Sequence, residues 1–178
     1  LKMKSEKVLF GAGCFWGVQA SFNLIENLSG VQVGYSGGNS INANYQDVCS
    51  GNSGHIEVVQ VTFIPEVTPF SLLLDLFFFI HDPTQLNKQG NDVGHQYKSA
   101  IFYNNLDQKR LSEKKILELE KNIQKDQQIQ TELFQLKNFF TAEEYHQNYL
   151  DKNPLGYCHI NIQQVKDFLK SAPYFRNS

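Results

Sequence analysis

The stretch around residue 14 places a thiol between glycines and beside two large aromatic side chains. In "FGAGCFWGVQ", residues 10–19, Cys14 is followed by Phe15 and by Trp16, the only tryptophan of the chain. A free cysteine is most often buried and inert, and on that interpretation both aromatic residues belong to the core. The apolar run before Cys14 and the helical pattern after it predict a strand-to-helix turn. A helix N-terminus favours the thiolate, so the other interpretation is a nucleophile with a lowered pKa beside an apolar pocket.

A carboxylate interrupts the strongly apolar strand pattern "HIEVVQVTFI", residues 55–64. The alternation of side chains along a strand places Glu57 on the same face as Val59, Val61 and Phe63. If this face is buried, the pKa of the carboxyl rises, and a protonated carboxyl in an apolar pocket can act as a general acid near neutral pH. The pattern leaves a second interpretation equally open, in which Glu57 lies at the strand start and reaches solvent.

Two polar loops carry groups that could hold a polar part of a substrate. Asp92 and Tyr97 lie in "GNDVGHQY", residues 90–97, and Tyr45 lies in the glycine- and asparagine-rich stretch 36–54. Long loops inside a compact domain are often functional. A loop aspartate more commonly caps the backbone N–H groups of a turn, so a structural role is the more frequent alternative.

The sequence does not favour a metal site or a disulfide framework. Glu143 and His146 form a single E-x-x-H pattern, whereas di-iron bundles need two such motifs and further glutamates. The histidines show no zinc-like pairing. The three cysteines, Cys14, Cys49 and Cys158, have no C-x-x-C spacing, and their odd number indicates a reducing compartment. Cys49 has no aromatic company and is expected to take no part in chemistry.

The elements that must position these residues follow from the apolar patterns, which show no regular βαβ alternation and favour an α+β layered domain. Strands are predicted at residues 7–11, 31–35, 55–64, 96–103 and 131–136. Helices are predicted from Cys14 to about Asn27, at residues 70–80 with Thr68 as N-cap and Pro69 as first residue, and at residues 107–126, 142–150 and 162–170. No linker divides the chain, so residues 1–178 are expected to form a single domain.

Composition excludes several classes of function. The 178 residues include 41% hydrophobic and 19% charged residues, which is ordinary for a globular chain. The net charge of −2 and the lack of a basic stretch argue against nucleic acid as a partner. The most apolar run, residues 70–80, contains Asp75 and is shorter than the ~20 residues of a membrane span. No signal-peptide pattern is found, so we expect no membrane partner and a cytoplasmic location.

Six motifs occur together and in order, and this combination is highly specific. They are "GCFWG" (13–17), "GYSGG" (34–38), "YQDVCSGNSGHIEVV" (45–59), "DPTQLNKQGNDVGHQYKS" (82–99), "AEEYHQNYL" (142–150) and "NPLGYC" (153–158). Over roughly residues 8–160 the chain resembles the A-class peptide methionine sulfoxide reductases. The resemblance implies a two-layer α+β sandwich around a mixed β-sheet. It also implies a ferredoxin-like core, long irregular loops and a coil-rich C-terminal tail.

The resemblance further implies reduction of methionine-S-sulfoxide, free or in proteins, without a cofactor and with thioredoxin as the reductant. It makes Cys14 the nucleophile, Glu57 the proton donor and Cys158 the thiol that resolves the Cys14 sulfenic acid into a Cys14–Cys158 disulfide. It also implies a set of substrate-binding residues: Phe15 and Trp16 around the methyl group, and Tyr45, Asp92 and Tyr97 to orient the substrate.

The sequence departs from the family pattern at a few positions away from the reacting atoms. Ser53 stands where threonine is usual, Lys88 and Lys98 stand where arginine is common, and no cysteine follows Cys158 to extend a thiol relay. Two other classes of function stay open. A thiol peroxidase or cysteine redox sensor would use a low-pKa Cys14 without an aromatic pocket, and a non-catalytic module would use such a pocket to bind a methylated ligand.

Overall fold

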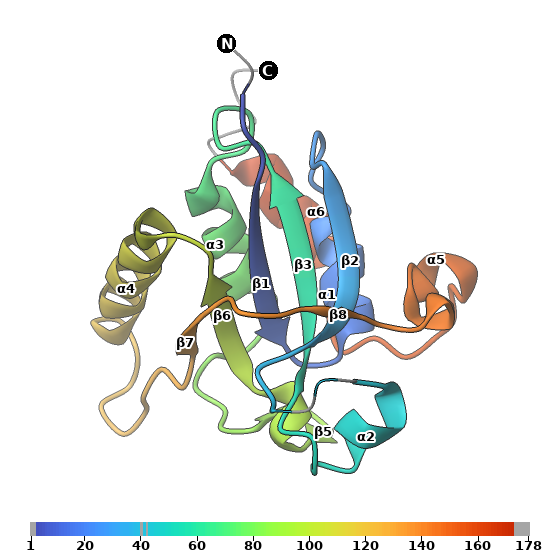
Figure 1. The fold of residues 1–178 in the computed structure, drawn as a ribbon. Coiled ribbons are helices and arrows are strands. Elements are labelled where there is room, and N and C mark those ends of the chain that lie inside the picture. Colours follow the sequence, from blue (N-terminus) through green and yellow to red (C-terminus); the bar gives the residue numbers. More distant parts are fainter. Residues whose placement is uncertain (1–2, 40, 42, 173–178) are drawn as a thin grey trace.

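A six-stranded β-sheet forms the centre of the computed structural model, which describes residues 3–39, 41 and 43–172 (Figure 1). Its strand order is β7-β6-β1-β3-β2-β8. The strands are β1 (Glu6–Ala12), β2 (Gly30–Ser36), β3 (Ile56–Phe63), β6 (Ser99–Tyr103), β7 (Glu132–Gln135) and β8 (Phe140–Thr141), with β4 (Lys88–Gln89) and β5 (Asp92–Val93) in a separate two-stranded ribbon. Neighbouring strands of the large sheet are antiparallel except β6 and β7, which are parallel. The prediction of a mixed α and β fold around a mixed sheet is confirmed.

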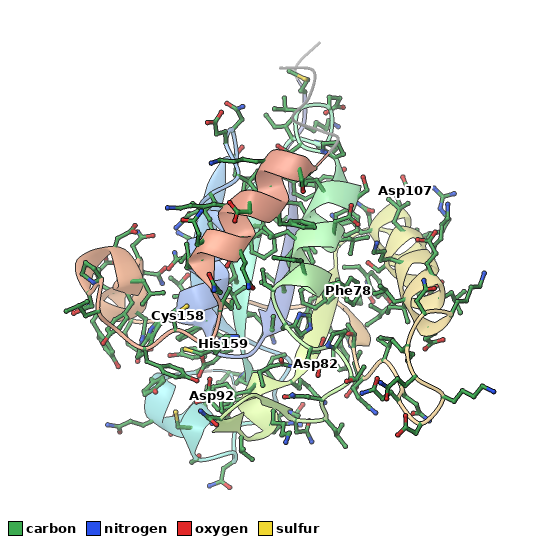
Figure 2. The ribbon with its side chains drawn as sticks, turned by 180° about the vertical axis from the view of Figure 1, so that it is seen from behind. Phe78, Asp82, Asp92, Asp107, Cys158 and His159 are labelled. Atoms are coloured by element: carbon green, nitrogen blue, oxygen red, sulfur yellow. The ribbon has the colours of Figure 1, made fainter. Side chains whose placement is uncertain are left out.

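Helices lie around this sheet, and some of them cover one of its faces. They are α1 (Phe15–Phe22), α2 (Tyr45–Cys49), α3 (Phe70–Phe79), α4 (Leu106–Glu120), α5 (Tyr149–Lys152) and α6 (Ile162–Ser171), with short 3₁₀ turns at His95–Tyr97 and Glu144–His146. Figures 1 and 2 show α1, α3 and α6 behind the sheet in the first view and α3 and α6 in front of it in the second. Within the described residues, no helix combines the length and the apolar character that crossing a membrane requires.

Apolar side chains fill both faces of the sheet. On the helical face Phe10 stacks between Phe22 and Phe77, with ring centroids 5.1 and 5.0 Å away. On the other face Leu9 and Phe102 belong to a smaller buried cluster. Phe134 of β7 packs against this cluster, and so do Leu136 and Phe139 of the segment between β7 and β8. That segment crosses the sheet in Figure 1. The sheet is therefore held from both sides, and the ends of its strands carry the site.

Four predicted helices differ from the structure. The helix expected over residues 142–150 is wrong: Glu144–His146 forms a 3₁₀ turn and only Tyr149–Lys152 is α-helical, because Asn148 between them has a left-handed φ of 53°.

The other three predicted helices begin or end elsewhere in the structure. Helix α1 stops at Phe22 instead of continuing to Asn27, which has a left-handed φ of 68° that ends any helical path. Helix α3 has Pro69 at its N-cap position without a side-chain hydrogen bond, so the expected cap at Thr68 is wrong. Helix α4 ends at Glu120, and the polar residues after it do not continue the turn.

The two long loops contain more regular structure than the sequence indicated. Within 36–54, Asn44 caps α2 by accepting the N–H of Asp47 at 2.9 Å. Within 81–95 lies the β4–β5 hairpin, and Tyr97 belongs to a 3₁₀ turn that precedes β6. Elements of two to five residues are too short to show a hydrophobic period, which is why the patterns missed them.

Candidate active site

The predicted turn between strand and helix is confirmed at Cys14. Strand β1 ends at Ala12, α1 begins at Phe15, and Cys14 occupies the N-cap position of that helix. Gly13 between them has φ of 91°, a left-handed conformation that favours glycine. A Cβ atom at this position would also lie 2.9 Å from the Cβ of Gln89. The turn thus requires glycine, and it leaves the Cys14 side chain only 8% exposed.

Burial decides the charge of the Cys14 thiol. Desolvation raises its pKa well above the ordinary value, the nearby Glu57 carboxyl raises it further, and the backbone N–H of Trp16 lowers it only in part. The expectation of a lowered pKa at the helix N-terminus is therefore wrong. A thiolate buried among apolar groups loses more hydration than one backbone N–H returns.

Glu57 lies on the buried face of β3, which settles the question that the strand pattern left open. Glu57 is only 2% exposed, and its Oε1 accepts a hydrogen bond from the backbone N–H of Phe15 at 3.1 Å. Burial raises the pKa of Glu57 to about 8, with a smaller increase from the charge of Asp92 and an opposing effect of the Phe15 hydrogen bond. Near neutral pH the carboxyl holds a proton, and the backbone contact fixes it next to Cys14.

Aromatic rings and one imidazole surround the first turn of α1. This aromatic wall consists of Phe15, Trp16, Tyr45, His146 and Tyr149. The Nε1 of Trp16 donates to the Nδ1 of His146 at 3.0 Å, and the Trp16 ring stacks on Tyr149 with centroids 3.8 Å apart. The His146 ring also lies 5.1 Å from Phe15 and 4.6 Å from Tyr45. Because Nδ1 accepts, the proton belongs on Nε2, which is buried without a hydrogen-bond partner in the described part of the chain.

The aromatic wall includes two residues, His146 and Tyr149, that are not among the site residues that the sequence predicts. The sequence signal was the cluster of aromatic residues and histidine in "EYHQNY", but it does not say which residue elsewhere meets it. Strand β8 pairs with β2, and this pairing brings the following segment to α1.

The carboxylate of Glu143 connects three tyrosines by hydrogen bonds, and one of them, Tyr45, belongs to the aromatic wall. This carboxylate accepts hydrogen bonds from the Tyr35 hydroxyl at 3.0 Å, the Tyr145 hydroxyl at 3.1 Å and the Tyr45 backbone N–H at 3.2 Å. Burial would raise the pKa of Glu143, but these bonds together keep it below the ordinary value. An ionised Glu143 therefore fixes Tyr45, the residue that the sequence proposed for substrate binding.

Asp92 and Tyr97 lie in the segments after α3. Asp92 on β5 accepts a hydrogen bond from the hydroxyl of Tyr157 at 3.0 Å. Burial raises the pKa of the Tyr97 phenol, and the charges of Glu57 and Asp92 raise it further. The structure thus brings together both loop residues that the sequence proposed, and adds Tyr157 to them.

The second thiol packs on α1, the helix that begins directly after Cys14. Cys158 is half-buried, and its Sγ donates to the carbonyl of Ile160 at 3.1 Å. A Cβ atom on Gly17 of α1 would lie 2.9 Å from that Sγ, so the thiol sits directly on the helix that starts after Cys14. All three cysteines are free, and the exposed Cys49 shares a hydrogen bond with Tyr45. The segment that carries Cys158 thus packs on α1.

The chemistry of these groups is that of a thiol redox site. The site combines the buried thiol of Cys14, the buried carboxyl of Glu57 and the aromatic wall. The thiol of Cys158 lies on α1 next to them. Among the residues that the structure describes, no group of three or more His, Cys, Asp or Glu side chains is arranged to hold a metal ion.

Comparison with known proteins decides the family. A family model described as peptide methionine sulfoxide reductase matches residues 6–176. The chain belongs to the peptide methionine sulfoxide reductase family. It is 48% identical over 155 residues to the peptide methionine sulfoxide reductase MsrA of Methanothermobacter thermautotrophicus, an alignment that covers 87% of this chain and 92% of the relative.

Solved structures of methionine sulfoxide reductases have the same fold. Reduced Mxr1 from Saccharomyces cerevisiae is similar with a TM-score of 0.79 and 39% identity, over 87% of this chain and 89% of that chain. Mxr1 in complex with Trx2 is similar with a TM-score of 0.55 and 27% identity, over 84% and 89% of the two chains. The alternative classes that the sequence left open are therefore not needed to explain the site of this reductase.

Proposed function

We propose that this methionine sulfoxide reductase acts on methionine-S-sulfoxide, free or in proteins, with Cys14 as its nucleophile and Glu57 as its proton donor. One observation carries the proposal. The carboxyl of Glu57 is buried, has a pKa of about 8, and is bonded to the backbone of Phe15 directly after the thiol. A general acid must hold its proton at the working pH and release it to the reacting atom, and these values meet both conditions.

In the first step the Cys14 sulfur attacks the sulfoxide sulfur while Glu57 protonates the sulfoxide oxygen. This attack forms an S–S bond between Cys14 and the substrate sulfur. The protonated oxygen then moves to the Cys14 sulfur as the substrate S–O bond and this S–S bond break, so the substrate is reduced to methionine and the thiol is oxidised to sulfenic acid. The thiol proton of Cys14 replaces the proton that Glu57 gave up. The raised pKa of the Cys14 thiol is compatible with this order, because positive charge on the protonated sulfoxide favours the thiolate once substrate is bound.

The aromatic wall supplies the selectivity for a methyl sulfoxide. Phe15 and Trp16 contact the apolar methyl group, while Tyr45, Asp92 and Tyr97 orient the polar part of the substrate. The hydrogen bond between Trp16 and His146 and the ring contact with Tyr149 support this assignment, since they fix the indole in one orientation.

In the second step Cys158 attacks the sulfenic acid. The S–O bond of Cys14 breaks, a Cys14–Cys158 disulfide forms, and the thiol proton leaves with hydroxide as water. A thioredoxin then reduces the disulfide by thiol exchange. The Mxr1 structure with Trx2 supports a thioredoxin as the reductant of this chain too.

The order of strands and helices supports a finer description of the fold. Strands β6-β1-β3-β2 are all antiparallel neighbours, and with α1 and α3 between them in sequence they support a ferredoxin-like unit in a two-layer sandwich. One domain over residues 1–178 is supported by the single large sheet to which distant segments contribute. A cytoplasmic location is supported by three free cysteines.

The test is incubation of the protein with each epimer of methionine sulfoxide and dithiothreitol, with methionine release followed over time. The proposal predicts sustained turnover of the S epimer and background release from the R epimer. Equal turnover of both epimers would contradict it, and turnover of peroxide without turnover of sulfoxide would identify a thiol peroxidase instead.

A further inference from the structure

His159, the residue after the second thiol, bonds to the turn that carries the first. Its Nε2 lies 3.2 Å from the carbonyl oxygen of Ala12, the last residue of β1 and two positions before Cys14. A carbonyl only accepts, so Nε2 carries the proton and donates it. Figure 2 shows Cys158 and His159 together on the segment that leads into α6, with Asp92 near them.

The imidazole has only one of its two nitrogens satisfied. Burial lowers the pKa of His159, which keeps the ring neutral, and its Nδ1 is buried without a hydrogen-bond partner in the part of the chain that the structure describes. A buried acceptor without a partner is unfavourable. The donor bond to Ala12 is therefore the polar contact that holds this ring in place.

Two glycines make room for the contact. A Cβ atom at Gly13 would lie 3.1 Å from the Nε2 of His159, and one at Gly17 would lie 2.9 Å from the Sγ of Cys158. The side chains of His159 and Cys158 thus lie against Gly13 and Gly17, one glycine on either side of Cys14. This arrangement fixes the backbone of the second thiol relative to the backbone of the first.

We propose that His159 is a positioning residue for disulfide formation, an inference that rests on the proposed function. Its bond to Ala12 holds Cys158 over the start of α1, so that the Cys158 sulfur is within reach when Cys14 becomes a sulfenic acid. Disulfide geometry is narrow, with Cα atoms usually about 4.4–6.8 Å apart. Holding both backbones in place therefore raises the rate at which the two sulfurs meet. The first step, which uses Cys14 and Glu57, does not depend on this bond.

The test compares wild type with His159→Gln and His159→Asn. Glutamine places an N–H donor near the position of Nε2, whereas asparagine is too short to reach the Ala12 carbonyl. Each protein is mixed with excess methionine-S-sulfoxide without reductant. Methionine per chain reports the first step, trapping with dimedone reports the lifetime of the sulfenic acid, and mass spectrometry after alkylation reports the Cys14–Cys158 disulfide.

We expect all three proteins to release about one methionine per chain. His159→Asn should form the disulfide roughly three- to tenfold more slowly, the factor that one lost hydrogen bond gives, with a matching increase in trapped sulfenic acid. His159→Gln should stay close to wild type. A wild-type disulfide rate in His159→Asn, or equal slowing in both variants, would overturn the inference. If wild type releases no methionine, the proposed function fails and the inference falls with it.

Discussion

At Cys14, burial and the helix N-terminus act on the thiol in opposite directions, and burial prevails. The pKa of the thiol is raised, and so is that of the Glu57 carboxyl, to about 8. Both groups therefore carry their protons near neutral pH. A protonated pair avoids two uncompensated negative charges in an apolar pocket, and it delivers the proton of Glu57 only when a sulfoxide oxygen arrives to take it.

Glu57→Gln should slow the first step and leave substrate affinity much less changed. Glutamine keeps the shape of the side chain but cannot transfer a proton, and general acid catalysis typically contributes ~10²–10⁴-fold. Rapid-quench measurement of methionine formation in a single turnover gives the rate of this step directly. A rate within about threefold of wild type would show that another group is the acid.

The same residue makes the stability of the folded chain depend on pH. Because the pKa of Glu57 is higher in the folded chain than its ordinary value of 4.5, the folded state binds more protons between these values. The free energy of unfolding therefore falls as pH rises, by an amount on the order of a few kcal/mol between about pH 5 and about pH 8.

Glu57→Gln should lose this contribution. Urea unfolding of reduced wild type and of the variant at both pH values measures it, and the wild type should lose more stability than the variant on going to the higher pH. Parallel changes in the two proteins would mean that Glu57 titrates alike in the folded and unfolded chains.

At the scale of elements, α1 is the part on which both thiols depend. The helix starts directly after Cys14, and its Gly17 lies under the sulfur of Cys158. Glycine inside a helix lowers helix stability by roughly 1 kcal/mol relative to alanine, so the helix itself gains nothing from it. The close approach of the C-terminal segment explains why glycine is useful at this position.

Gly17→Ala should slow disulfide formation. The added Cβ would lie 2.9 Å from the Cys158 Sγ and 3.1 Å from a side-chain carbon of Ile160, so the segment must move away from α1. Thiol alkylation during a single turnover should show a longer-lived sulfenic acid, with methionine release unchanged. Gly30→Ala is a matched control, because its Cβ would have only ordinary contacts at 3.9 Å. Equal rates in both variants would mean that the segment tolerates the displacement.

At the scale of the whole molecule, the site is assembled from segments that lie far apart in the chain. Trp16 and His146 are 130 positions apart and share a hydrogen bond. Local patterns could predict β1, β3 and the turn at Cys14, because alternation and glycine placement are visible over a few residues. They could not predict which histidine meets Trp16, because that contact depends on the pairing of β8 with β2 across the sheet.

The electrostatics of the site was also only partly predictable. A carboxylate among Val59, Val61 and Phe63 indicated a raised pKa if it was buried, and the structure buries it. The position of Cys14 before a helix indicated a lowered pKa, and this was wrong because sequence does not report how deeply a thiol is covered. Burial results from the whole sheet and its helices, which no local pattern contains.

The central claim, that Cys14 itself takes the oxygen of methionine sulfoxide, is tested most directly by counting methionine in a single turnover without reductant. Wild type, Cys14→Ser and Cys158→Ser are each mixed with methionine-S-sulfoxide, and methionine is measured per chain. We predict about one methionine from wild type and from Cys158→Ser, since the first step needs only the first thiol, and none from Cys14→Ser. Methionine above background from Cys14→Ser would contradict the account and move the nucleophile to another thiol.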